Sequence, residues 1–469
     1  MAPSGIIKKT IETINHETRR ELLKMSVTQV MEQYQSILEE EVHTIAWETS
    51  AVKRKGKLDA ATLVQMTIFG FWQDPDIRLS GLAQIGGRRE VHVTESAISQ
   101  RFTPECANMF LKIMQRLAEV HLKSEKVDIP LLKQFSAVIV EDSTSITLPT
   151  ELADIWLGCG GGEGASEAGV KAFVQWDVTC GELFGPRLSN ARMNDHKTPF
   201  DIEELPEGSL YIADLGFFAI ERFYRIAKGK SGKRYFVSRL QPKTNLYNRR
   251  GHCFDLAGIL PKQVGQVREM GAILGQKNGV PVRVIMLRVP KEVAEERQER
   301  ICRKAQKNGN VPSEEVLELA HWTIVVTNIP RKRASYSEIL ILLRLRWQIE
   351  RLFRLWKEDG KIDEWRTMKP YRILCEFYAK MCAMIIQQSF IQEGCWLDPL
   401  RSLVKAADSL RRECNRIMVA FYEGNLEKTV QSILRTLRSG CRIERRSAYP
   451  STAQLLLEGL DWQIELLLT

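Results

Sequence analysis

The sequence lacks the long apolar segments that mark membrane and exported proteins. It has no run of about 18 apolar residues, so no membrane-spanning helix is predicted. Its N-terminus has lysines but no apolar core before a cleavage site, so no secretory signal peptide is predicted. Its 10 cysteines include no CxxC pair and no Cys/His spacing of a zinc site. We therefore expect reduced, mostly buried thiols and a cytoplasmic protein.

Length and composition are typical of a globular protein with several domains. A chain of 469 residues is too long for one ordinary core, and two to four domains are expected. The net charge is +9, and residues 331–372 alone carry 12 Lys or Arg against 6 Asp or Glu. A local basic surplus indicates a polyanionic partner, most often nucleic acid, although a basic surface without a partner gives the same count.

The stretch 336–365, YSEILILLRLRWQIERLFRLWKEDGKIDEW, has apolar residues at steps of three and four and predicts one amphipathic helix. Ser337 is a suitable residue to cap its start, and Gly360 a suitable residue to end it. On a straight α-helix, Arg346, Glu350 and Lys357 fall within an arc of roughly 40°. A carboxylate between two cations is either part of a site or an ordinary helical ion pair.

The remaining chain predicts an α/β protein. Residues 1–128 read as helical, and polar residues 99–101 on a short helix either face DNA or pack within a bundle. From Pro130 onward, β-branched runs predict strands, two of which end in an aspartate. Residues 244–328 contain short strands, turns and one charged helix, which indicates a separable β-rich block. After Gly360 the chain is helical again.

Three acidic residues are candidates for a metal site. Asp142 and Asp214 come at strand ends, and Glu350 lies on the predicted helix. Carboxylates that converge repel one another unless a cation neutralises them. Such oxygen ligands suit Mg²⁺ or Mn²⁺, and two ions about 3.5–4 Å apart can activate a nucleophile and stabilise the leaving oxygen of a phosphodiester. Spacing alone leaves open whether the three acids meet.

The helix motif resembles the signature of DDE insertion-sequence transposases of the IS-four family. That signature is Tyr, two residues, Arg, three residues, Glu, six residues, Lys. The sequence matches it at Arg346, Glu350 and Lys357, inside RWQIERLFRLWK, but has Leu343 where the signature has Tyr. A hydrogen bond made by that Tyr would be missing here, which implies reduced activity.

The resemblance extends over residues 135–378. Asp142 in VIVEDSTSITLP and Asp214 in YIADLGFF match the two aspartates of the family, and WTIVVTNIP resembles the last strand of its insertion domain. With Glu350, they are the implied catalytic and metal-binding residues, holding two Mg²⁺ or Mn²⁺ ions per active site.

The resemblance also implies a domain organisation. The expected fold is an RNase H-like core, a mixed sheet flanked by helices, interrupted by a β-rich insertion between the second Asp and the Glu. The expected parts are a helical DNA-binding region (1–128), the first part of the core (129–243), the insertion (244–329), the core helix with Glu350 (330–375) and a helical C-terminal region for dimerisation or DNA contact (376–469).

The implied activity is metal-dependent cut-and-paste transposition through a hairpin intermediate, in a homodimer that pairs double-stranded transposon ends at the nucleoid and joins them to target DNA. Trp322 matches a tryptophan that stacks on a flipped base near the hairpin, but a core tryptophan is an equal alternative. Arg239 and Lys243 resemble DNA-backbone contacts, and Arg346 and Lys357 are assigned to phosphates near the cleavage site. The alternative function is a catalytically weakened, transposase-derived DNA-binding protein.

Overall fold

The structure is a computed structural model that describes residues 24–53, 56–122, 124–160, 166–229, 233–307, 309–446 and 450–458. Parts of the two predicted helical ends, residues 1–23 and 459–469, lie outside these described residues. The chain forms two compact units, the first from Met1–Val127, Ser143–Met193 and Glu350–Ile443 and the second from Asp128–Asp142, Asn194–Ile349 and Glu444–Thr469.

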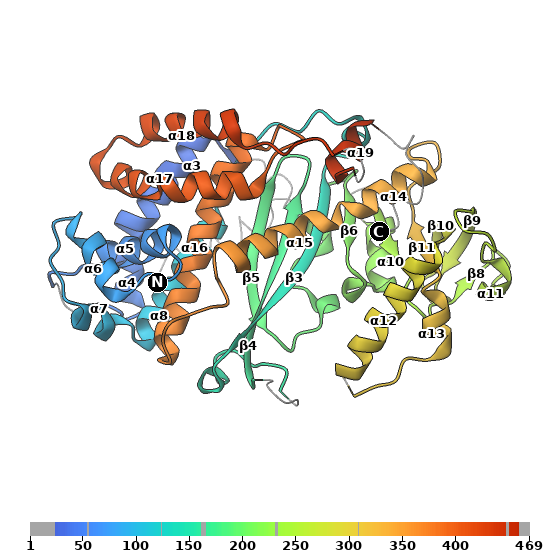
Figure 1. The fold of residues 1–469 in the computed structure, drawn as a ribbon, viewed down its shortest axis with the longest axis horizontal. Coiled ribbons are helices and arrows are strands. Elements are labelled where there is room, and N and C mark those ends of the chain that lie inside the picture. The colour runs from blue at the N-terminus through green and yellow to red at the C-terminus, as the bar shows by residue number, and fades with distance from the viewer. Residues whose placement is uncertain are drawn as a thin grey trace, which may run out of the picture. The chain divides into compact units, whose positions relative to one another are not determined.

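The first unit contains a bundle of helices from both ends of the chain (Figure 1). Its longest helix, α16, has mostly buried side chains on every face and packs against α5, α8 and α18. A helix that is apolar all round is stable only inside a core. The bundle helices are α3 (Val27–Ser36), α4 (Val42–Glu48), α5 (Ala60–Gln73), α6 (Leu79–Gly87), α7 (Glu95–Arg101), α8 (Pro104–Ala118), α16 (Pro370–Cys395), α17 (Leu403–Glu423) and α18 (Leu426–Gly440).

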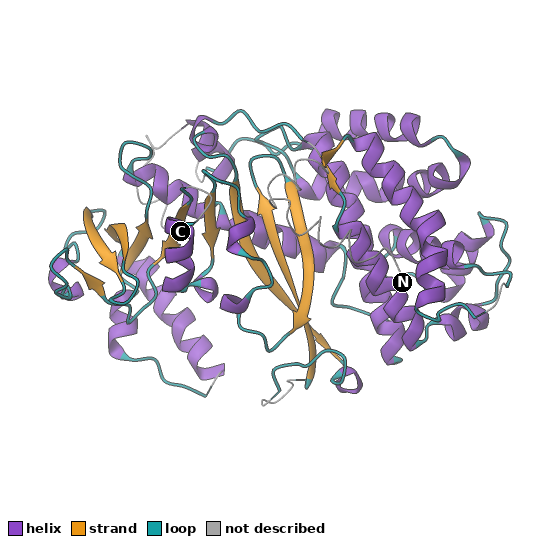
Figure 2. Cartoon of the chain, turned by 180° about the vertical axis from the view of Figure 1, so that it is seen from behind, coloured by secondary structure: helices purple, strands orange, loops and turns teal. Residues whose placement is uncertain are grey.

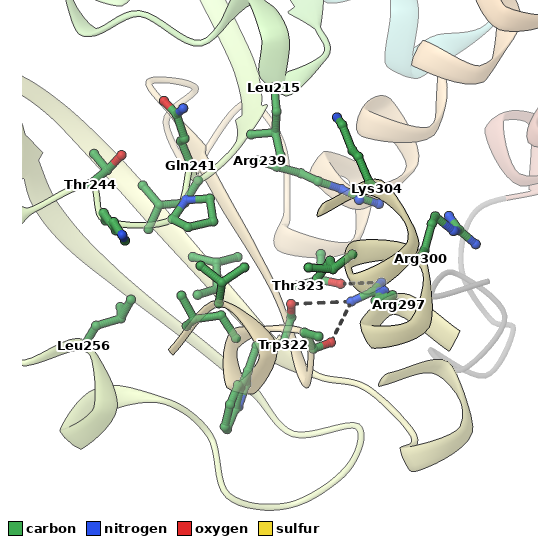
Figure 3. Close-up of a pocket in the computed structure, with 18 residues that line it drawn as sticks. Leu215, Arg239, Gln241, Thr244, Leu256, Arg297, Arg300, Lys304, Trp322 and Thr323 are labelled. Atoms are coloured by element: carbon green, nitrogen blue, oxygen red, sulfur yellow. Dashed lines mark hydrogen bonds between the residues drawn. The ribbon is translucent and has the colours of Figure 1, made fainter. Parts of the chain in front are cut away.

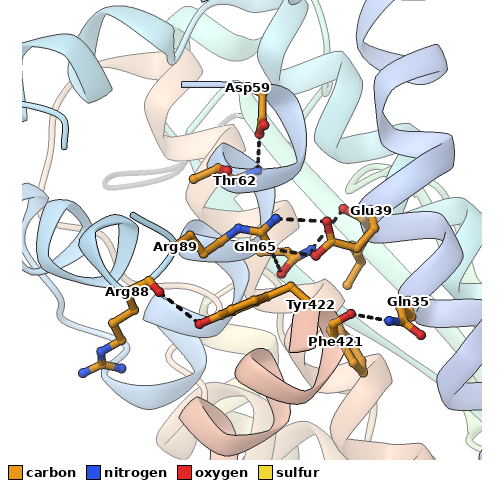
Figure 4. Close-up of polar contacts among 10 residues, drawn as sticks. Gln35, Glu39, Asp59, Thr62, Gln65, Arg88, Arg89, Phe421 and Tyr422 are labelled. Atoms are coloured by element: carbon orange, nitrogen blue, oxygen red, sulfur yellow. Dashed lines mark hydrogen bonds and ion pairs between the residues drawn. The ribbon is translucent and has the colours of Figure 1, made fainter. Parts of the chain in front are cut away.

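A polar cluster ties four parts of this bundle together (Figure 4). The guanidinium of Arg89 donates to both carboxylate oxygens of Glu39, at 2.7 and 3.0 Å, and to Gln65 Oε1 at 2.5 Å. Its Cζ also lies 4.9 Å from the ring centroid of Tyr422. Arg89 is largely buried, so its charge is compensated inside the bundle.

One mixed sheet of nine strands has the order β5-β4-β3-β6-β7-β11-β10-β9-β8 (Figure 2). β6 pairs in parallel with both β3 and β7, whereas the pairs β4–β5, β7–β11, β11–β10, β10–β9 and β9–β8 are antiparallel. The predicted α/β class is confirmed. The strands are β3 (Val138–Leu148), β4 (Ala168–Asp177), β5 (Glu182–Asn190), β6 (Leu210–Ala213), β7 (Tyr235–Arg239), β8 (Leu246–Tyr247), β9 (Val267–Leu274), β10 (Val280–Arg288) and β11 (Trp322–Thr327), with a separate pair β1 (Lys24–Met25) and β2 (His121–Leu122).

The β-rich block predicted over 244–328 extends the sheet rather than forming a separate one. Its last strand, β11, pairs with β7, with Arg239 opposite Val325 and Val237 opposite Thr327. The helices of the second unit are α9 (Pro130–Lys133), α10 (Ile220–Lys228), α11 (Leu256–Ile259), α12 (Lys291–Lys307), α13 (Glu314–Leu319), α14 (Tyr336–Arg344) and α19 (Thr452–Glu458), which packs against α14. Short 3₁₀ turns are η2 (Thr150–Leu152), η3 (Asp195–Lys197), η4 (Ile202–Glu204) and η5 (Leu215–Phe217).

The predicted single helix over 336–360 is divided into three segments. α14 ends at Arg344, α15 covers Arg346–Arg354, and η6 (Leu355–Asp359) is a π-helix, as η1 (Ile37–Glu41) is near the N-terminus. Ser335, not Ser337, caps the start, with Glu338 completing a capping box. Gly360 does follow the last helical residue. No described helix is long and apolar enough to cross a bilayer, and all ten cysteines are free thiols, most of them buried.

Candidate functional site

Asp142 and Asp214 follow paired residues on two neighbouring parallel strands. Glu141 of β3 lies opposite Ala213 of β6, and the two aspartates are the next residues along each strand. Neighbouring strands lie about 4.8 Å apart, so the register brings the aspartates side by side. Both are half-buried. At Asp214 the chain leaves the sheet, because the 3₁₀ turn η5 begins at Leu215 and precedes α10.

Arg346 gives Asp214 a cationic neighbour. Nη1 of Arg346 lies 3.5 Å from Oδ1 of Asp214, and the arginine side chain is 15% exposed against 49% for the aspartate. Arg346 is the first residue of α15, and Glu350 comes four residues later in that helix. Residues four apart in an α-helix face the same side, about 6 Å from each other. The predicted placement of Arg346 and Glu350 on one helix face is therefore confirmed.

Lys357, the third residue of the predicted arc, lies beyond α15 in the next helical segment. The π-helix η6 carries Lys357, and a π-helix turns less per residue than an α-helix. Lys357 Nζ donates to the carbonyl oxygen of Ser145 on β3 at 3.0 Å and lies 3.8 Å from Oδ2 of Asp363. The contact with Ser145 attaches η6 to the second half of β3.

A buried polar network lies on the other face of β3. Glu141, which precedes Asp142, is fully buried, and its Oε2 lies 3.6 Å from Nη1 of Arg222 on α10. The same Nη1 donates to Tyr211 Oη at 2.8 Å, and Nη2 donates to the carbonyl oxygen of His196 at 3.3 Å. Burial raises the pKa of Tyr211 well above its usual value, and the negative charge of Glu141 adds to this. Glu141 and Asp142 are consecutive on β3, so their side chains point to opposite faces of the sheet.

Three residues predicted separately as DNA contacts line one cavity of about 340 Å³ (Figure 3). Arg239 ends β7, Lys243 lies in the turn that follows with φ of 66°, and Trp322 begins β11. The indole Nε1 donates to the carbonyl oxygen of Pro261 at 2.8 Å, and the guanidinium of Arg288 lies 5.2 Å from the indole centroid. Trp322 is half-buried and lines the cavity, so it is not a fully buried core tryptophan.

Helix α12 adds three cations that sequence reasoning did not single out. Arg297, Arg300 and Lys304 line the same cavity. Their spacing of three and four residues places them on one helix face, and that spacing was the available signal. The pKa of Arg297 is lowered to about 10, mainly by burial and also by the positive charges of Arg239 and Arg300.

Arg297 also links α12 to the start of β11. Its Nη1 donates to the carbonyl oxygens of Ala320 and Trp322, at 3.4 Å each, and its Nη2 donates to Thr323 Oγ1 at 3.1 Å. Figure 3 shows these bonds on the strand that carries Trp322. Arg297 therefore holds the backbone of Trp322 and its neighbours in place.

A family model described as "Transposase DDE domain" matches residues 133–386, which is more than half of the chain. The chain belongs to this family. It is a DDE transposase, an enzyme that cleaves and transfers DNA, and the predicted family resemblance is confirmed.

Curated relatives of this transposase come from several bacteria. It is 28% identical over 382 residues to the transposase for insertion sequence element IS231F of Bacillus thuringiensis subsp. israelensis, a match that covers 75% of this chain and 77% of the relative. It is 22% identical over 375 residues to the transposase for IS1151 of Clostridium perfringens, covering 75% and 78%. A shorter match, 28% over 149 residues, is to the putative transposase InsL for IS186A of Escherichia coli K12, covering 30% and 40%.

The family match includes every predicted site residue, namely Asp142, Asp214, Arg239, Lys243, Trp322, Arg346, Glu350 and Lys357. Across the described residues, no group of three or more His, Cys, Asp and Glu side chains is arranged to hold a metal ion. The strand pairing does supply two adjacent carboxylates, and carboxylate oxygens are the donors that Mg²⁺ and Mn²⁺ prefer. The donor chemistry at Asp142 and Asp214 therefore fits such a cation.

Proposed function

We propose that this transposase moves its own insertion sequence by cut and paste, with Asp142, Asp214 and Glu350 as the catalytic carboxylates. The observation that carries the proposal is the β3–β6 register, which puts the two aspartates side by side within the matched family domain. Arg346 supports the third member, because it contacts Asp214 and lies one helical turn from Glu350. The relatives' description as transposases for insertion sequence elements supports the substrate.

The proposed domain organisation follows from the same assignment. An RNase H-like core comprises 129–243 and 330–375, and the β-rich segment 244–329 is inserted between Asp214 and Glu350. The helical regions 1–128 and 376–469 are assigned to DNA contact and dimerisation. Strands β8 to β11 fall in the proposed insertion, and their pairing with β7 gives that insertion a fixed attachment to the core.

Asp142, Asp214 and Glu350 would hold two Mg²⁺ or Mn²⁺ ions. When bound, the ions supply activation of water or a 3′-hydroxyl and stabilisation of the leaving oxygen. The protein's part is to position the carboxylates at rigid strand ends and to keep cationic side chains beside them. Arg346 is assigned to a phosphate next to the cleaved bond, where a guanidinium binds two phosphate oxygens at once.

The remaining DNA contacts are assigned by position. Arg239 and Lys243 bind the DNA backbone, and Lys357 binds a phosphate near the cleavage site. Trp322 stacks on a base that flips out of the DNA double helix during hairpin formation, and this stacking contributes about 1–3 kcal/mol of binding free energy. The partners are double-stranded transposon ends and target DNA, bound by a homodimer at the bacterial nucleoid.

The test is nicking of DNA that carries the element's own ends, with Mg²⁺, by wild type, Asp214→Ala and Glu350→Ala. We expect wild type alone to cut, and EDTA to abolish cutting. The matched control is Glu358→Ala, which removes a carboxylate that is 74% exposed on η6 and should cut like wild type. Equal cutting by wild type and Glu350→Ala would refute the catalytic assignment. Absence of cutting by wild type would favour the DNA-binding alternative, and equal cutting of unrelated DNA would indicate a general nuclease.

A further inference from the structure

The cavity beside Trp322 is lined by cations of two separate elements and by no carboxylate. Arg239 and Lys243 come from the end of β7 and its following turn, and Arg297, Arg300 and Lys304 come from α12. Among the described residues that line it, none is Asp or Glu. Figure 3 shows Arg239 extending from its strand toward α12. Like charges gathered in a concave site attract an anion, because the low-dielectric walls concentrate the field.

Apolar side chains also line the cavity. They include Leu256, Val316 and Leu319, together with the indole of Trp322. A volume of about 340 Å³ is within the range of pockets that hold one small organic group. A cavity lined by both apolar and cationic side chains fits a nucleobase with its phosphate. The stiff double helix cannot enter such a space, whereas an unpaired strand can.

We propose that Arg300 and Lys304 of α12, with Arg239 facing them, form a phosphate-binding site for an unpaired DNA strand. This site rests on the proposed function. It adds α12 to the DNA-binding elements and names unpaired DNA as the form that α12 binds. Arg300 is an exposed side chain paired with Glu296, at 2.7 Å, and exchanges that surface partner for phosphate. Lys304 is exposed and makes no ion pair with a described residue.

Arg297 has a different role at this site. Its guanidinium is engaged by the carbonyl oxygens around Trp322 and by Thr323, so it is a positioning residue. Its buried positive charge adds to the electrostatic field in the cavity, but its side chain does not bind the DNA strand directly. The phosphate contacts are therefore tested on the two exposed residues alone, which can be changed without disturbing β11.

The experiment measures binding of the full-length protein to an oligothymidylate of about 20 nucleotides and to a duplex of equal length, by fluorescence anisotropy in EDTA, at about 50 to 200 mM salt. The test variant is Arg300→Gln/Lys304→Gln. The control is Lys291→Gln/Arg303→Gln, which removes two charges from α12 residues that do not line the cavity. Each lost phosphate contact lowers the salt slope by about 0.7 for single strands.

Two lost contacts should therefore weaken single-strand binding roughly 25-fold at 0.1 M salt and lower the slope by about 1.4. The control should change binding less than the test variant, and both variants should melt like wild type. Equal losses in the two variants, or an equal loss for duplex and single strand, would overturn the proposal. Because EDTA prevents cleavage, this outcome is independent of the nicking assay, and Asp214→Ala should bind the oligothymidylate like wild type.

Discussion

The Glu141–Arg222 pair should dominate the local stability of the strands that carry the aspartates. Arg222→Met removes the cation that lies 3.6 Å from the fully buried Glu141 carboxylate. Breaking a buried pair in this way costs about 3–5 kcal/mol. Tyr211 stays in contact with Glu141, so we expect the lower end, about 3 kcal/mol. In contrast, the apolar double variant Glu141→Leu/Arg222→Met should have nearly the same stability as wild type, because it removes both buried charges.

Hydrogen exchange read by mass spectrometry on β3 and β6 is the suitable assay, because it reports local opening of these strands. A loss of about 3 kcal/mol should raise exchange there on the order of a hundredfold. The control is Arg225→Met on the same helix, whose pair with Asp201 is 42% and 54% exposed and should contribute under about 1 kcal/mol. The assignment of buried charge compensation fails if β3 and β6 exchange no faster in Arg222→Met than in Arg225→Met. It also fails if they exchange as fast in the double variant as in Arg222→Met.

Three further predictions concern stability. Arg89→Met should lower the free energy of unfolding, measured by thermal melting, by about 2 kcal/mol, because it leaves the half-buried carboxylate of Glu39 in Figure 4 without this arginine. The control Lys112→Met, from an exposed pair, should lower it by under about 1 kcal/mol, and equal losses in the two variants would contradict the prediction. Leu343 is 9% exposed, so Leu343→Tyr, which restores the signature residue, should overpack and cost about 1–3 kcal/mol; an unchanged melting temperature would show that the site has room. Lys361 lowers the pKa of Asp76, so Asp76 contributes stability above its unfolded pKa of about 3.9 and loses it as pH falls through the folded pKa. Asp76→Asn should therefore melt below wild type at neutral pH and match it in strong acid; a difference that persists there would refute the linkage.

Local patterns were sufficient for most strands and for the helix that carries Glu350. A β-branched run located β3, because strand propensity is a local property of the chain. The aspartates were found as strand-end residues. That they stand side by side could not be derived, because it depends on β6 pairing in parallel with β3 across about 70 residues of sequence.

The errors come from features that depend on tertiary packing. A change from α-helix to π-helix at Leu355 leaves the apolar spacing of the segment almost unchanged, so periodicity did not detect it. The cap fell on Ser335 rather than Ser337 because both residues are good caps and only the backbone decides between them. The α12 cations were read as part of a charged helix, since the cavity that they line is formed by β7, β11 and α13 from distant sequence.

The wide turn at η6 has a consequence for how this chain tolerates insertions and deletions. A π-helix holds one more residue per hydrogen-bonded ring than an α-helix, so the stretch behaves as a spacer of one residue after α15. Shortening it by one residue would rotate Lys357 away from the Ser145 carbonyl while leaving Arg346 and Glu350 in place. The contact of Lys357 with β3 thus depends on one added residue in η6, whereas Glu350 lies before that residue, in α15.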